Sequence, residues 1–173
     1  MKQLKLTAII CLLLSTSLVF TSCKKEDHTK YTITAAPVNF SQIALPAGVV
    51  IPPSAATGTL TGVYTPFDRT FNYTVSWSGL SGNASAIHIH GLADSGYIAL
   101  PAPLGPYANG IVQVFTSGFP KTSTGSFTGS LYIDGNTIKE ENLLSGKFFI
   151  DIHSVTVPYV NTGEIRGQIK FDK

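Results

Sequence analysis

The chain has 173 residues, of which 43% are hydrophobic and only 13% are charged. It can therefore form one packed core and is too apolar for a disordered polypeptide. Twelve Lys and Arg side chains stand against ten Asp and Glu, and loss of Lys2 and Lys5 with a signal sequence would leave ten of each sign. This balance argues against a nucleic-acid partner, and no Gly-rich loop followed by Lys and Ser or Thr indicates a nucleotide site.

The first residues are typical of a secretion signal. Residues 1–5 carry two lysines, and residues 6–20 form an apolar run shorter than the roughly 20 residues that span a bilayer. The segment Val19-Phe20-Thr21-Ser22-Cys23 resembles a bacterial lipobox. We therefore predict a signal peptide over residues 1–22 and a lipid on Cys23; an ordinary signal peptide with an incidental cysteine is the alternative.

The cysteine count favours the lipid. Cys11 leaves with the signal, so Cys23 is the only thiol of the mature chain and no disulfide can form within the domain. Residues 23–30 are polar and predict a lipidated tether, in which Lys24-Lys25-Glu26-Asp27 resembles the surface-export signal of outer-membrane lipoproteins. We expect a surface-exposed protein on the bacterial outer membrane.

Residues 31–173 predict one all-β domain. Short runs rich in Val, Ile, Phe and Tyr alternate with turns rich in Gly, Pro, Ser and Asn, without helical connections. This spacing indicates an antiparallel Greek-key β-sandwich of about eight strands. The predicted strands are 31–35, 57–64, 71–77, 85–90, 110–115, 126–133, 147–155 and 164–171.

Three segments interrupt the strand pattern. Residues 138–145 suggest a single helical turn that ends at Gly146. The prolines at positions 46, 52 and 53 mark an irregular excursion, and residues 100–106 predict a surface loop.

Three of the four histidines lie in the two most distinctive strands. Strand geometry places His88 and His90 on the face opposite Ile87 and Ile89, with attachment points about 6.6 Å apart. In 148–153 the same alternation places Asp151 and His153 opposite Phe148, Ile150 and Ile152, and in the last strand it places Arg166 on the outward face. If these strands are neighbours, His88, His90, His153 and Arg166 share one polar surface.

Three imidazoles without thiolates suit copper or zinc, and they would leave positions open for water or substrate. The alternative is an amphipathic strand in which each imidazole is hydrogen-bonded to a backbone carbonyl. For Arg166 the alternative is a surface salt bridge with Glu164, Asp151 or another acid.

Three stretches closely resemble the CHRD domain family: 86–91 (AIHIHG), 144–154 (LSGKFFIDIHS) and the closing 161–169 (NTGEIRGQI). The resemblance covers about residues 32–171, and the closing stretch is its most specific part. Family members often have Asn and Thr where this chain has Asp151 and Ser154. The resemblance implies an all-β domain of secreted or surface proteins, mostly without an assigned reaction.

Copper/zinc superoxide dismutases are distantly similar, because they also carry a His-x-His strand, a copper-binding His in a later strand and a late Arg. The similarity implies a superoxide-dismutase-like or immunoglobulin-like sandwich, with His88, His90 and His153 as copper ligands and Arg166 as an anion guide. Counterparts of the bridging histidine, the zinc loop and the paired cysteines are absent, so at most a copper-only or inactive version is implied.

Two functions follow. The leading one is a lipid-anchored CHRD domain of binding or structural character, held to the membrane through Cys23, with an unidentified protein or glycan ligand. The alternative is a copper-binding redox protein that uses the three histidines. Whether the protein is an enzyme stays open, although no hydrolase motif is found.

Overall fold

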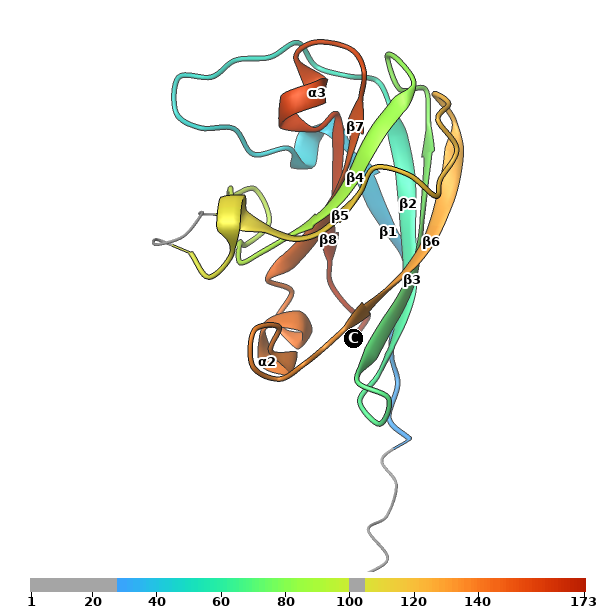
Figure 1. Cartoon of the computed structure of the whole chain (residues 1–173), viewed down its shortest axis with the longest axis vertical. Helices are drawn as coiled ribbons and strands as arrows, with labels where there is room; N and C mark the ends of the chain where they lie inside the picture. Colours follow the sequence, from blue (N-terminus) through green and yellow to red (C-terminus); the bar gives the residue numbers. More distant parts are fainter. Residues whose placement is uncertain (1–27, 100–104) are drawn as a thin grey trace, which may run out of the picture.

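The computed structural model describes residues 28–99 and 105–173 (Figure 1). The signal peptide, Cys23 and most of the tether lie outside the described residues, as does the segment 100–104 of the predicted surface loop. Among the described residues, no helix has the length and apolar character needed to cross a membrane.

The domain is all-β, as the sequence predicts. Its eight strands pair only in antiparallel fashion and form one hydrogen-bonded sheet in the order β5-β4-β7-β8-β1-β2-β3-β6. The strands are β1 (Tyr31–Asn39), β2 (Thr57–Thr65), β3 (Thr70–Ser78), β4 (Ala84–His90), β5 (Ile111–Phe115), β6 (Gly125–Tyr132), β7 (Phe148–Ser154) and β8 (Ile165–Ile169).

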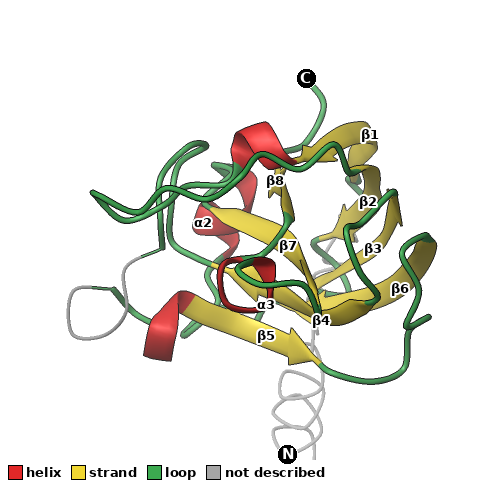
Figure 2. Ribbon diagram, turned by 90° about the horizontal axis from the view of Figure 1, so that it is seen from above, coloured by secondary structure: helices red, strands yellow, loops and turns green. Residues whose placement is uncertain are grey.

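The sheet folds over on itself into a sandwich. One layer contains β5, β4, β7 and β8, the other contains β1, β2, β3 and β6, and the layers join where Asn39 of β1 pairs with Arg166 of β8 (Figure 2). At the two free edges the Gln113 amide of β5 donates to the Ser130 carbonyl of β6 at 3.2 Å. The sandwich therefore nearly closes into a barrel.

Alternating apolar side chains fill the space between the layers. Ile87 and Ile89 of β4 and Ile150 and Ile152 of β7 are completely buried, and Trp77 packs there from the opposite layer. This is the face that the period-two pattern assigns to the core. The opposite faces of β4 and β7 are thereby free to carry polar groups.

Short helices connect the strands. The predicted helical turn is α2 (Glu140–Leu144), followed by Gly146 at φ 71, a conformation that favours glycine. The sequence gives no sign of the second short helix, α3 (Tyr159–Thr162), or of the two 3-10 turns η1 (Phe40–Gln42) and η2 (Ala108–Gly110). Helix α3 packs against β7 and lies over its polar face.

The polar face of β7 and β8 is buried, which differs from the outward surface expected from the sequence. Asp151, His153, Glu164, Arg166 and Gln168 are all at most 8% exposed. The reason is long-range: helix α3 and the loops after β1 and β4 cover this face, and sequence periodicity does not report such coverage. The domain thus has a second, polar interior beside its apolar core.

Candidate metal centre

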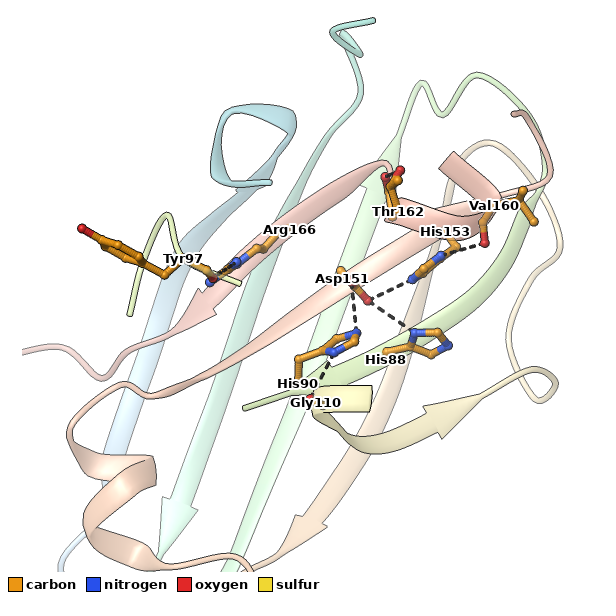
Figure 3. A network of polar contacts seen from close by, with 10 residues as sticks. His88, His90, Tyr97, Gly110, Asp151, His153, Val160, Thr162 and Arg166 are labelled. Carbon is orange, nitrogen blue, oxygen red and sulfur yellow. Dashed lines mark hydrogen bonds and ion pairs between the residues drawn. The ribbon is translucent and has the colours of Figure 1, made fainter. Parts of the chain in front are cut away.

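The pairing of β4 with β7 brings the conspicuous side chains together. His88 lies directly opposite Asp151, Ala86 opposite His153, and His90 opposite Phe149. Since side chains alternate between the faces of a sheet, His88, His90, Asp151 and His153 all project to the polar side (Figure 3). We call these four residues the His–Asp cluster.

The four side chains converge on one point. Asp151 Oδ2 lies 3.2 Å from His90 Nε2, and Asp151 Oδ1 lies 3.3 Å from His153 Nε2 and 3.9 Å from His88 Nδ1. One ligand atom from each of the four residues lies within 4.8 Å of the others. The adjacency of the three histidines, which the sequence could only suppose, is therefore present in the fold.

Backbone carbonyls fix the orientation of two rings. His90 Nδ1 lies 3.2 Å from the carbonyl oxygen of Gly110, and His153 Nδ1 lies 3.1 Å from that of Val160 in α3. A carbonyl oxygen only accepts, so each Nδ1 carries the hydrogen. In the neutral form of each ring, the Nε2 lone pair then faces the centre of the cluster, which is the usual arrangement of a metal-binding histidine.

The atoms that face the centre lack hydrogen-bond partners. They are His88 Nδ1, His90 Nε2, His153 Nε2 and Asp151 Oδ1, all of them buried. His90 Nε2 and His153 Nε2 lie within ion-pair distance of the Asp151 carboxylate, but neither nitrogen forms a hydrogen bond. Buried polar atoms without partners are rare, and a single cation at the centre would satisfy all four.

Electrostatic attraction and burial compete within the cluster. Burial lowers the pKa of His88 to about 4, against the attraction of Asp151. Burial would also lower the pKa of His153, but Asp151 and the Val160 carbonyl outweigh it and raise that pKa above its ordinary value. Burial opposes ionisation of Asp151, yet His153 and His90 hold its pKa below the usual range. The carboxylate is therefore charged whether or not an ion is bound.

Arg166 lies beside the cluster without contacting it. Because β7 lies between β4 and β8, the Phe149 ring separates His90 from Arg166. The His90 and Phe149 rings stack with centroids 5.0 Å apart, and the Arg166 guanidinium carbon lies 3.4 Å from the Phe149 ring centre. Arg166 is 2% exposed, so it does not form the surface salt bridge considered as an alternative. Its role as an anion guide stays a prediction.

Asp151 is the residue whose importance the sequence understates. It is recognisable there only as a negative charge beside three histidines, whereas the structure makes it a fourth donor in contact with all of them. The sequence left open that each imidazole is hydrogen-bonded to a backbone carbonyl. This is true of one nitrogen of His90 and one of His153, and the other nitrogen of each ring is directed at the centre. Four donors, rather than three, are available to an ion.

A pocket of about 320 Å³ opens next to the cluster. His90, Asp151 and Arg166 line it, together with Ile43 and Leu45 from the loop after β1 and Ile98 from the loop after β4. The cluster can therefore be reached from one side through a partly apolar opening.

A family model for the CHRD domain matches residues 40–169, which include all four residues of the cluster and Arg166. The chain belongs to the CHRD domain family. No curated protein and no solved structure matches it. The CHRD match covers most of the sandwich and supports a binding or structural module, and the His–Asp cluster shows that a metal ion could be held within it.

The two buried histidines with shifted pKa values should titrate far apart in metal-free protein. On lowering the pH, the His153 ring gains its proton first, above the ordinary pKa of 6.5, and the His88 ring gains its proton last, near pH 4. Imidazole NMR signals of chelator-treated protein, assigned with His88→Gln and His153→Gln variants, would report both steps.

The shifts affect stability with opposite signs. His88 contributes stability fully above pH 6.5 and loses it as the pH falls through about 4. His153 contributes fully below its ordinary pKa and loses the contribution as the pH rises through its higher folded value. Simultaneous titration of both rings near pH 6.5 would contradict this description of the cluster.

Proposed function

We propose that this CHRD domain is a lipid-anchored binding module on the outer surface of the bacterial outer membrane, and that its central ligand is a divalent transition-metal ion. The observation that supports a bound metal ion is the convergence of four buried donor atoms that have no hydrogen-bond partners. The anchor rests on the lipobox-like sequence that ends at Cys23.

The donor set selects the class of ion. Three imidazole nitrogens and one carboxylate oxygen suit zinc or copper, whereas calcium and magnesium prefer sites made of oxygen. Four protein donors satisfy a tetrahedral ion without any contribution from a substrate. This favours a module that holds its ion over one that must turn over to be useful.

A copper-dependent redox activity is the second candidate. The pocket that reaches His90 and Asp151 favours it, because a redox ion needs access for its substrate. Copper could cycle between two oxidation states within an imidazole site, in line with the distant similarity to superoxide dismutases. Arg166 would then supply positive charge within that pocket.

Metal binding should depend on the cluster alone. The chain from Lys24 to Lys173 should bind about one zinc or copper ion, and the His88→Ala/His90→Ala/His153→Ala variant should lose binding by more than about 100-fold. His28→Ala is the matched control, because His28 is the one histidine outside the cluster. Metal content and affinity are measured after dialysis, with circular dichroism to verify folding.

If the parent and the triple variant both bind the same, substoichiometric amount of metal, the proposed metal site is wrong and only the proposal of a binding module remains. Stoichiometric copper bound by the parent alone justifies a superoxide assay. If that assay shows turnover, Arg166→Ala should slow it in a salt-sensitive manner through lost electrostatic attraction.

Tyr159 should act on the ion indirectly. Its hydroxyl donates to the Pro52 carbonyl at 2.8 Å and holds α3 in place, and the next residue, Val160, supplies the carbonyl that orients His153. Tyr159→Phe should therefore weaken metal binding about tenfold. Tyr64→Phe is the control, because it removes a buried tyrosine's hydrogen bond, to Glu140 Oε1 at 2.8 Å, and neither β2 nor α2 supplies a carbonyl that orients a histidine of the cluster.

Both tyrosine variants should lose similar stability in chemical denaturation, about 1 kcal/mol. Only Tyr159→Phe should change the metal affinity. Equal affinities in the two variants would show that α3 does not position His153.

The anchor depends on a single sulfur atom. Cys23→Ser should abolish lipid labelling and move the protein from the membrane fraction to the soluble fraction, because a hydroxyl does not form the thioether. Protease accessibility on intact cells tests surface exposure of the wild-type protein. Membrane retention of the Cys23→Ser variant would contradict anchoring through this residue.

A further inference from the structure

The pocket beside the His–Asp cluster has both polar and apolar lining residues. His90, Asp151 and Arg166 are among the polar ones, and Ile43, Leu45 and Ile98 are among the apolar ones. Its volume of about 320 Å³ is at the lower end of small-molecule sites, so it fits a ligand of about one ring. Of the cluster, only His90 and Asp151 border it, so a ligand here would approach an ion from their side.

Charge determines what this pocket can accept. Burial lowers the pKa of Arg166 only to about 10, so the guanidinium is positive at neutral pH. Asp151 is the only acidic residue among those that line the pocket. A divalent ion together with Arg166 would therefore leave an excess of two positive charges beside the pocket, and excess charge in a buried site requires a counter-ion.

The charge of Arg166 is not neutralised by an ion pair among the described residues. Its Nη1 donates to the Tyr97 carbonyl at 2.7 Å, and its Nη2 donates to the Asp94 carbonyl at 3.2 Å and to Gln168 Oε1 at 2.9 Å. All three acceptors are neutral. The remaining nitrogen, Nε, is buried and has no partner. The pocket thus has a fixed cation that forms no direct ion pair with a described residue.

We propose that this pocket binds a small organic carboxylate with a compact apolar body. The carboxylate lies in the pocket beside His90 and Asp151, where it offsets the positive charge of the bound ion and of Arg166, and the apolar body packs against Ile43, Leu45 and Ile98. The inference rests on the proposed metal site, and it names the class of ligand that the bound ion recruits.

Benzoate is the test ligand, because it joins a carboxylate to one apolar ring. It is titrated into zinc-loaded protein (Lys24 to Lys173) and followed by NMR. Acetate and benzyl alcohol are the comparison ligands: the first lacks the ring and the second lacks the charge. Benzoate should bind at least about tenfold more tightly than either, and chelator-treated protein should not bind it measurably.

Two tryptophan variants locate the ligand. Ala44 lines the pocket, whereas Ala47 is an exposed residue of the same loop that does not. Ala44→Trp should keep zinc but weaken benzoate binding at least tenfold, because the indole fills the pocket. Ala47→Trp should leave both affinities unchanged.

The two proposals fail in distinguishable ways. Three results with zinc-loaded protein would overturn the ligand proposal and leave the metal site unaffected. They are no binding of benzoate, binding of acetate as tight as that of benzoate, and unchanged benzoate affinity in Ala44→Trp. If chelator-treated protein binds benzoate as tightly as zinc-loaded protein does, the ion has no role in binding the ligand. Failure to bind either zinc or copper would overturn both proposals.

Discussion

The register between β4 and β7 is the constraint on which the rest of the domain depends. Ile87 and Ile89 pair with Ile152 and Ile150, and all four are completely buried. A shift by one residue would move these side chains to the polar face and turn the histidines into the apolar core. The hydrophobic effect therefore fixes the geometry of the His–Asp cluster, without any contribution from the cluster itself. The site is predetermined by the packing on the other side of the sheet.

The polar interior above this pair is almost fully hydrogen-bonded. The Glu164 carboxylate accepts hydrogen bonds from the Ser54 hydroxyl and from the Ser81 amide and hydroxyl, and the Gln168 amide donates to two backbone carbonyls. Against this background the cluster is exceptional, since it holds half of the eight buried side-chain atoms without partners in the described chain. The buried Glu164 and Gln168 side chains are satisfied locally, so four unsatisfied atoms that converge on one point indicate a group supplied from outside.

Sequence periodicity was sufficient for the strands and their faces, because alternation reports which side of a strand is apolar. It predicted that His88 and His90 share one face of their strand, and that His153 is on the other face of its strand from Ile152. It could not predict that these strands are neighbours, because their pairing joins residues 59 to 70 positions apart and depends on how the sandwich folds over. It also could not show that loops cover the polar face, which turned Asp151 from a surface charge into a buried donor.

The closing stretch, the most specific part of the family resemblance, gains a physical explanation from this arrangement. Gly163 has φ 76, and a β-carbon there would lie 3.2 Å from an oxygen of Asp151. Gly167 lets β1 approach closely, since a β-carbon would meet Val38 at 2.7 Å. Between them Arg166 packs on Phe149, which in turn stacks on His90. Each residue type thus supports the enclosure of the cluster from β8. This stretch therefore supports the centre from one side without supplying a donor to it.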